Sequence, residues 1–116
     1  LLGEQGEIDA ALACQREAVR LKPGIVEFRF NLGLALMKKG DFKAARPELE
    51  EALRLKPDLP DAHYHLGAVQ LSEGETDKAM ASFKEALRLR PGYAAARWGM
   101  GSVLNMNGEP DAAIEE

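Results

Sequence analysis

The sequence is poor in cysteine, in long apolar runs and in clustered basic residues. One cysteine, Cys14, occurs among 116 residues, which rules out an internal disulfide and leaves no cysteine cluster to hold a metal ion. A lone cysteine is compatible with a cytoplasmic location without requiring one. Apolar stretches are too short to span a membrane, so a membrane partner is not expected.

The charge balance argues against nucleic acid as a partner. The chain has 15 basic and 19 acidic residues and a net charge of −4. Lys38, Lys39 and Lys43 lie close together, but Asp41 is among them and acidic residues follow, which is typical of a solvated helix face.

No set of residues with catalytic spacing is present. His63 and His65 are two residues apart, which on a helix separates them by about 200° around the axis, so they cannot jointly hold a metal ion. There is no Ser/His/Asp set, no paired carboxylate in an apolar setting and no phosphate-binding glycine loop. We therefore predict a protein that is not an enzyme and has no cofactor.

What the sequence does contain is a repeat with a fixed period of 34 residues. Nothing is inserted or deleted between copies, and such a period is typical of solenoids, in which each repeat buries its apolar face against its neighbours. The recurring positions are Gly6, Gly40, Gly74 and Gly108; Gly33, Gly67 and Gly101; Pro23, Pro57 and Pro91; Ala11, Ala45, Ala79 and Ala113; and Ala18, Ala52 and Ala86.

The repeat predicts an all-α fold of antiparallel helix pairs joined by short turns. We expect Gly6 to end a first helix formed by residues 1–5, and Pro110 to open a last one. The helices expected between them are 8–21, 26–39, 42–55, 60–73, 76–89 and 94–107. As a single solenoid domain, residues 1–116 divide into a partial repeat 1–25, full repeats 26–59 and 60–93, and a partial repeat 94–116. The chain begins without methionine and both ends fall inside a repeat, which suggests a piece of a longer protein.

Several residues predict local details. Asp41 and Asp58 are expected to cap the helices that follow them, and Pro60 suits a first turn.

Gly33 and its equivalents cost about 1 kcal/mol inside a helix, so a close approach of the partner helix is expected there. Pro47 cannot donate a backbone hydrogen bond, which predicts an exposed position and a kink.

Apolar residues at helical spacing predict the buried faces. In helix 42–55 these include Ala45, Leu49 and Ala52. In helix 8–21 they are Ile8, Ala11, Leu12, Ala18, Val19 and Leu21.

The pattern resembles the tetratricopeptide repeat (TPR), a helix-turn-helix of the same length with a Trp-x2-Leu-Gly-x2-Tyr, Ala-x3-Phe and Pro signature. The second repeat has Leu32-Gly33, Leu36, Ala45, Leu49 and Pro57; the third has Leu66-Gly67, Gln70, Ala79, Phe83 and Pro91. The signature tryptophan is replaced by Arg29, His63 and Arg97. The resemblance implies a right-handed superhelix that binds a protein or peptide in its concave groove.

Of two specialised TPR subgroups, one is excluded and the other has weak support. The carboxylate clamp for acidic chaperone tails uses lysine, asparagine and arginine, whereas the matching positions here are Phe30, Leu34, His65, Ala95 and Gly99. An asparagine ladder, as in protein O-glycosyltransferases, would need more than Asn31, because its equivalents are His65 and Gly99.

A second apolar stripe predicts the binding site. Phe30, Leu34 and Met37 are spaced i, i+4, i+7, on the side opposite Leu32 and Leu36, so the core is not expected to need them. The same spacing joins Tyr64, Ala68 and Leu71, and then Trp98, Ser102 and Asn105. The predicted groove residues are Phe30, Asn31, Leu34, Met37, Tyr64, His65, Leu71, Trp98 and Asn105.

The leading hypothesis is a protein-interaction scaffold that binds a partly apolar peptide or helix. One alternative is a structural unit that assembles with copies of itself through the groove or the solenoid ends, where Leu1, Leu2, Ala113 and Ile114 lack a covering helix. Another is a regulatory or targeting segment of a larger transferase.

Overall fold

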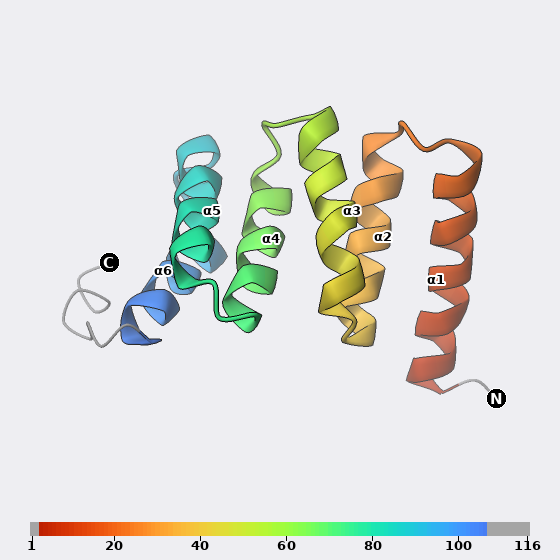
Figure 1. Ribbon diagram of the computed structural model, residues 1–116, viewed down its shortest axis with the longest axis horizontal. Coiled ribbons are helices and arrows are strands. Elements are labelled where there is room, and N and C mark those ends of the chain that lie inside the picture. Colours follow the sequence, from red (N-terminus) through yellow and green to blue (C-terminus); the bar gives the residue numbers. More distant parts are fainter. Residues whose placement is uncertain (1–2, 107–116) are drawn as a thin grey trace. The chain divides into compact units, whose positions relative to one another are not determined.

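The computed structural model describes residues 3–106, in two compact units that meet between Pro57 and Asp58. Each unit contributes three helices to the described residues, and neither contains a strand there (Figure 1). Unit 1 holds α1 (Glu4–Leu21), α2 (Val26–Lys39) and α3 (Phe42–Leu55); unit 2 holds α4 (Pro60–Ser72), α5 (Thr76–Leu89) and α6 (Ala94–Met106).

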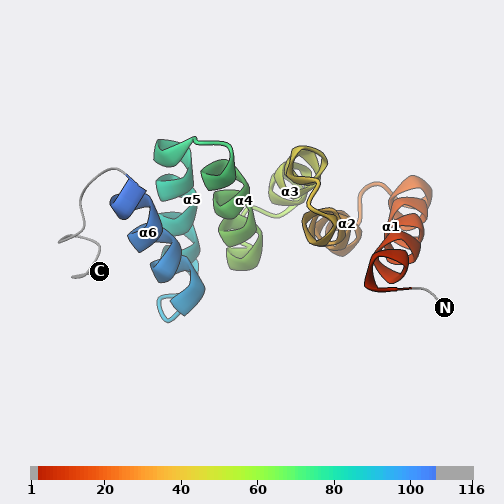
Figure 2. The same cartoon turned by 90° about the horizontal axis from the view of Figure 1, so that it is seen from below.

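The predicted helices after residue 25 are confirmed almost to the residue, whereas the helix predicted for 8–21 already begins at Glu4. The bounds of α2, α3 and α5 are those expected, α4 ends one residue earlier, and α6 is helical to Met106, the last residue that the structure describes. Successive helices of a unit run in opposite directions (Figures 1 and 2). Within the described residues, no helix is long and apolar enough to cross a membrane. The helix expected at Pro110 and the apolar end residues Leu1, Leu2, Ala113 and Ile114 lie outside the described part of the chain.

Glycine ends the first helix of each complete pair. Gly40 has a φ of +87° and Gly74 a φ of +79°, the left-handed conformation that residues with a Cβ rarely adopt. The N–H of Gly40 donates to Met37 O, and that of Asp41 donates to Leu36 O, both at 2.9 Å. This pair of bonds is a Schellman motif, which satisfies carbonyls that the helix end would otherwise leave unpaired.

One of the two predicted aspartate caps is correct. Asp41 Oδ1 accepts a hydrogen bond from the Ala44 N–H at 3.1 Å, as an N-cap residue should. Asp58 does not cap α4, because the N-cap is Leu59, which makes no side-chain cap bond. Pro60 at the first helical position holds Leu59 in an extended conformation, so Asp58 lies one residue too far upstream to reach the helix.

The expectation that Gly6 ends a helix is wrong. Gly6 lies inside α1, which begins at Glu4, and its φ is not positive. The Glu7 N–H donates to Gly3 O at 3.0 Å, so the chain gains helical hydrogen bonds across this stretch. These bonds offset the cost of about 1 kcal/mol for a glycine inside a helix.

The core of unit 2 is built on Phe83. Its ring is almost fully buried and lies against two glycines of the flanking helices. A Cβ added at Gly67 of α4 would lie 2.7 Å from Phe83 Cε1, and one added at Gly99 of α6 would lie 2.6 Å from Phe83 Cζ. The missing side chains therefore allow α4 and α6 to approach the ring, and α6 contacts both α5 and α4.

Unit 1 repeats this contact on a smaller scale. A Cβ added at Gly33 of α2 would lie 3.1 Å from Leu49 Cγ, and Leu49 is fully buried in α3. The prediction that these glycines allow close helix approach is thus confirmed at Gly33 and Gly67. The helix expected to face Gly101, from Pro110 onward, lies outside the described residues.

Polar residues in unit 1 replace the signature tryptophan. Arg29 Nη1 forms a half-buried ion pair with Glu48 Oε1 at 2.9 Å, which links α2 to α3. Arg29 Nε also donates to Pro23 O at 3.0 Å, which fixes the turn before α2. Arginine thus connects the two helices where the family usually packs an indole ring.

The predicted buried face of α1 is only partly buried. Leu12 and Val19 lie in the core of unit 1, as expected. Ala11 and Leu21 are exposed, and Ala18 is half-buried. Helix α2 packs against the side of α1 that carries Leu12 and Val19, whereas the side that carries Ala11 and Leu21 is exposed.

We expect Gly67→Ala to destabilise the protein. Overpacking against Phe83 costs about 1–3 kcal/mol, and the better helix propensity of alanine offsets at most about 1 kcal/mol. Urea unfolding should show a lower midpoint. Gly92→Ala is the matched control, since nothing lies within 4 Å of a Cβ there. Adding Phe83→Leu to Gly67→Ala should reduce the penalty of the alanine, because leucine already faces glycine in unit 1. An unchanged or raised midpoint in Gly67→Ala would refute the close-approach explanation.

We expect Pro47→Ala to raise the free energy of unfolding. Helix α3 continues through Pro47, which is exposed as predicted but leaves the Lys43 carbonyl without its helical donor. Alanine restores that bond, with a gain of up to about 3 kcal/mol if the strain is unrelieved. A lower melting temperature would show instead that the helix depends on a bend at the proline.

Candidate functional site

The predicted groove residues fall on the first helix of each pair. Helices α4 and α6 contact one another within unit 2, so two of the three predicted sets lie on neighbouring helices there. The α4 set is Tyr64, His65 and Leu71, and the α6 set is Trp98 and Asn105. The third set, on α2 in unit 1, is Phe30, Asn31, Leu34 and Met37.

Trp98 is the most exposed large apolar side chain described. It is 80% exposed on the second turn of α6. One turn later, Ser102 Oγ donates to Trp98 O at 3.1 Å, and a further turn on, Asn105 is exposed. An indole ring, a hydroxyl and an amide therefore follow one another along the helix.

Tyr64 occupies the corresponding position of α4 but is half-buried. Its ring centroid lies 5.9 Å from that of Phe83, 5.4 Å from that of Tyr93 and 5.0 Å from that of His65. These distances are those of favourable aromatic pairs. Tyr64 thus extends the Phe83 core to the surface and supports the ring of His65.

The expectation that the core does not need this stripe is wrong for three residues. Tyr64 and Leu71 pack against the core of unit 2, and Met37 packs against that of unit 1. The reason is that α4 contacts both α5 and α6, so more than one of its faces is covered. On α2, Phe30 and Leu34 are half-buried and Asn31 is exposed.

A polar cluster holds the beginning of α4 to the turn before α6. Tyr93 Oη donates to Asp61 Oδ1 at 2.6 Å, and Arg90 Nη1 donates to the same oxygen at 3.1 Å. The Arg90 guanidinium also lies over the Tyr93 ring, 4.5 Å from its centroid. We call Asp61, Arg90 and Tyr93 the α4–α6 clasp, because it links the first turn of α4 to the turn that leads into α6.

The clasp shifts the protonation of its members. The hydrogen bond from Tyr93, and then Arg90, lower the pKa of Asp61 below its usual 3.8. Burial raises the pKa of Tyr93, and the bond to Asp61 adds to the effect. Both groups therefore keep one charge state, anionic aspartate and neutral tyrosine, over the physiological range.

His65 is held in its neutral form by its surroundings. Burial lowers the pKa of His65 below 6.5, and the nearby Asp61 carboxylate opposes this effect only in part. A neutral imidazole has one nitrogen that donates and one that accepts hydrogen bonds. At pH 7 the His65 ring is therefore uncharged.

A buried polar pair lies behind this surface. Ser82 Oγ of α5 donates to Gln70 Oε1 of α4 at 2.7 Å, and both residues are buried. A satisfied pair of this kind fixes the register of two helices, since a shift would leave two buried polar groups without partners.

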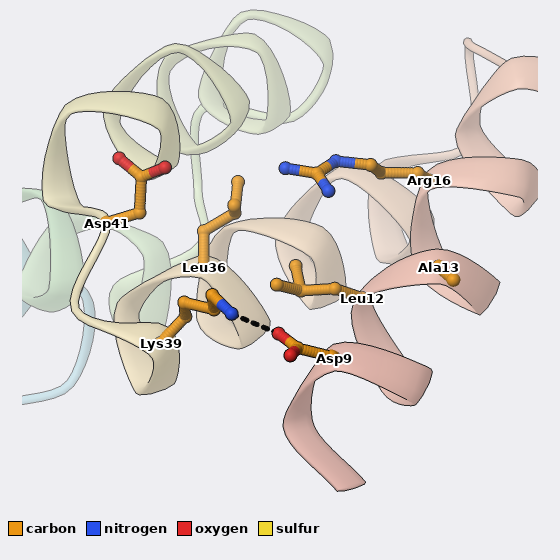
Figure 3. A pocket seen from close by; sticks show the side chains of 7 residues that line it. All are labelled: Asp9, Leu12, Ala13, Arg16, Leu36, Lys39 and Asp41. Carbon is orange, nitrogen blue, oxygen red and sulfur yellow. Dashed lines mark hydrogen bonds and ion pairs between the residues drawn. The ribbon is translucent and has the colours of Figure 1, made fainter. Parts of the chain in front are cut away.

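Unit 1 has a charged cleft of about 370 Å³ between α1, α2 and the start of α3. Figure 3 shows Lys39 meeting Asp9 across its mouth, Arg16 reaching over it from α1, and Leu12 and Leu36 beneath. Asp41, the last charged lining residue, already caps α3. Within residues 3–106, no three His, Cys, Asp or Glu side chains are grouped so that they could bind a metal ion.

Sequence reasoning missed the clasp and the buried pair. The available signals were breaks in the repeat. Tyr93 stands where the other copies have Ile25 and Leu59, and Gln70 stands where the others have Leu36 and Leu104. Nothing in the pattern of charges indicated the cleft of Figure 3.

The neutral state of His65 predicts a pH-dependent stability. The unfolded chain binds the proton first, at about pH 6.5, because burial lowers the pKa only in the folded state. The contribution of neutral His65 to the free energy of unfolding is complete above that pH. It is lost as the pH falls through the pKa that His65 has in the folded state. The free energy of unfolding of His65→Gln should fall less than that of the parent between pH 7 and 5. His63→Gln is the control, and identical slopes for His65→Gln and the parent would contradict the prediction. The pKa of Asp61 lies below its usual 3.8, so Asp61 stays ionised between pH 7 and 5 and does not affect this comparison.

Comparisons with known proteins agree with this geometry. A crystal structure of MamA is 26% identical over 99% of this chain and 71% of its own, with a TM-score of 0.87. A crystal structure of MamA protein is 29% identical over 93% of this chain and 59% of its own, with a TM-score of 0.86. The chain thus spans less than two thirds of the latter.

One similar structure contains a peptide. The first TPR of Spaghetti, bound to an HSP90 peptide, is 19% identical over 90% of this chain and 83% of its own, with a TM-score of 0.85, which shows likeness of fold. A comparison with curated proteins gives no significant match.

The family assignment rests on the whole length of the sequence. The tetratricopeptide repeat family matches residues 1–60, 31–94 and 69–116, which together cover the chain. The six helices and the similar solved structures fit an all-α helical-repeat solenoid. That the repeats form one domain stays a prediction. The chain belongs to the tetratricopeptide repeat family, whose members are generally protein-interaction modules.

Proposed function

We propose that this chain is a non-enzymatic scaffold that binds a partly apolar peptide or helix across α4 and α6, with Trp98 as the anchor. The exposure of Trp98, at 80%, is the observation that carries the proposal. Exposing an indole ring to water is unfavourable, and tryptophan is enriched among the residues that dominate binding at protein interfaces.

The surface around Trp98 is held on rigid elements. Phe83 packs between Gly67 of α4 and Gly99 of α6, and the clasp links the first turn of α4 to the turn before α6. A preformed surface loses little conformational entropy when a ligand binds. This supports a binding role for the face that carries Trp98.

The other predicted groove residues on α4 and α6 suggest the chemistry of the ligand. An apolar ligand residue would cover the indole, and Asn105 and His65 would supply hydrogen bonds to a main chain. On α2, Phe30, Asn31 and Leu34 repeat the combination of apolar residues with an amide.

The expected affinity is modest. Covering an aromatic residue buries about 150–250 Å², worth about 4–6 kcal/mol at roughly 25 cal/mol per Å². Association itself costs at least about 4 kcal/mol. Polar contacts must supply the remainder, so micromolar binding is the realistic expectation.

An acidic chaperone tail does not fit this surface. The HSP90 peptide belongs to the Spaghetti structure, and the positions that would form a carboxylate clamp here are apolar, small or a neutral histidine. We therefore propose that the ligand is not recognised through a terminal carboxylate. The HSP90 peptide SRMEEVD serves as a negative control.

Self-association is the second candidate. Two copies would associate through the face that carries the exposed Trp98. No feature of the described residues favours a segment of a transferase.

We expect Trp98→Ala to weaken the best peptide from a displayed library by about 30-fold or more, which corresponds to the 2 kcal/mol typical of an interface hot spot. Isothermal titration would measure the change. The high exposure of Trp98 means that its removal should leave the fold intact, which circular dichroism would verify.

The controls separate binding from folding. Phe42→Ala removes another exposed aromatic residue, at the beginning of α3, and should bind as the parent does. Tyr64→Phe keeps the ring that packs on Phe83 and is preferable to Tyr64→Ala, which would damage the core. If folded Trp98→Ala binds the peptide as tightly as Phe42→Ala, the proposed site is wrong.

A further inference from the structure

We propose that the cleft between α1, α2 and the start of α3 binds a glutamate side chain of a partner polypeptide, whose carboxylate pairs with Arg16 and Lys39. The cleft lies in unit 1 and has a volume of about 370 Å³. This is at the small end of the range of roughly 300–1,000 Å³ for ligand pockets, so it suits one side chain rather than a whole peptide. Trp98 belongs to the other unit, and the proposal does not rest on peptide binding there.

The first observation is that Arg16 has a charge without a partner. Among residues 3–106, its guanidinium makes neither a hydrogen bond nor an ion pair. The positions one helical turn away hold Leu12, Ala13, Val19 and Arg20, so α1 offers no carboxylate at the i±3 or i±4 spacing. Other arginines of the chain do pair with aspartate or glutamate, namely Arg20, Arg29, Arg46, Arg54, Arg88 and Arg90.

The second observation is that the side of α1 that lines the cleft is exposed in every repeat. Its residues at the cleft mouth are Asp9, Ala13 and Arg16. The equivalent residues are Lys43, Pro47 and Glu50 in α3 and Asp77, Ala81 and Lys84 in α5, and all six are exposed.

This exposure does not come from a missing helix. Helices α3 and α5 both pack on the first helix of their own repeat, α2 and α4, and the alanines that they bury there include Ala45 and Ala79. A helix that paired with α1 in the same way would cover the equivalent Ala11. Arg16 and the cleft would remain open.

The third observation is a second cation at the mouth of the cleft. Lys39 of α2 forms an ion pair with Asp9 of α1, and Figure 3 shows the Arg16 side chain reaching over the same opening. An ammonium group has three N–H donors. Lys39 can therefore keep its bond to Asp9 and also donate to a ligand carboxylate that Arg16 holds.

The charges of the lining favour a carboxylate over a phosphate. Arg16 and Lys39 are balanced by Asp9 and Asp41, so the cleft is neutral overall and accepts a single added negative charge more readily than the nearly two of a phosphate group. A carboxylate also matches the two parallel N–H groups of a guanidinium.

Two further features favour a side chain that is part of a polypeptide. Leu12 and Leu36 lie beneath the charges and are buried, so the methylene groups of a glutamate can lie against them. Asp41 uses Oδ1 to cap α3, and its second oxygen can accept a hydrogen bond from the main-chain N–H of the ligand. Free acetate or phosphate would lack that donor.

The first test is an NMR titration of the 116-residue chain with the blocked peptide acetyl-Ala-Glu-Ala-amide, followed at the backbone amides of Ala13 and Lys39. We expect saturable shifts with a dissociation constant of about 1 mM, because a solvent-exposed ion pair binds weakly. The matched peptide acetyl-Ala-Gln-Ala-amide should bind at least about tenfold more weakly. Equal affinity for the two peptides, or no saturable shift up to about 20 mM, would overturn the proposal.

Arginine variants identify the contact. Arg16→Gln should weaken binding of the glutamate peptide by about tenfold or more, whereas Arg20→Gln, which removes an exposed arginine already paired with Glu17, should bind as the parent does. Circular dichroism would verify that both variants fold. Equal affinities of Arg16→Gln and Arg20→Gln would refute the role of Arg16.

The second test asks whether Lys39 shares the carboxylate. Asp9→Asn removes the charge that competes for Lys39, so this variant should bind the glutamate peptide about threefold more tightly. Asp77→Asn changes the equivalent exposed residue of α5 and should have no effect. No tightening in Asp9→Asn relative to Asp77→Asn would contradict the proposed pair of cations. Inorganic phosphate that shifts the same amides with an affinity equal to that of the peptide would indicate an adventitious anion site only and would overturn the proposal.

Discussion

The contact between a glycine of one helix and a large apolar side chain of the next is the constraint on which each unit depends. Gly33 faces Leu49 in unit 1, and Gly67 and Gly99 enclose Phe83 in unit 2. Without a Cβ, the helix backbones can approach the leucine and phenylalanine side chains closely, which fills the core with few large residues. The cost of about 1 kcal/mol for each helical glycine is offset by this burial.

The candidate site follows from the same packing. Phe83 lies between α4 and α6, and the clasp of Asp61, Arg90 and Tyr93 links the first turn of α4 to the turn before α6. Trp98 projects from α6 and is 80% exposed. Tyr64 occupies the equivalent position on α4, but Tyr93 and Phe83 pack against it. Two aromatic residues at equivalent repeat positions thus have different roles, one in the core and one at the surface.

Regular positions of the repeat could be predicted from the sequence because each is enforced by local physics. Glycines with a positive φ end helices, prolines follow them, and Asp41 caps α3. The errors occurred where one copy differs from the others. Asp58 lies before a leucine and a proline, so it cannot reach the helix, and Gly6 lies inside a helix because helical bonds outweigh its cost. The burial of Tyr64 depends on Tyr93, a residue distant in sequence that helical periodicity does not connect with it.

The most direct test of the central claim uses the fact that Trp98 is the only tryptophan in the chain. Its emission reports on the proposed anchor alone. Titration with a bound peptide should shift the emission maximum to shorter wavelength, with saturation at the same concentration as the heat of binding. Saturable heat without any change in emission would show that the ligand binds elsewhere and would contradict the account.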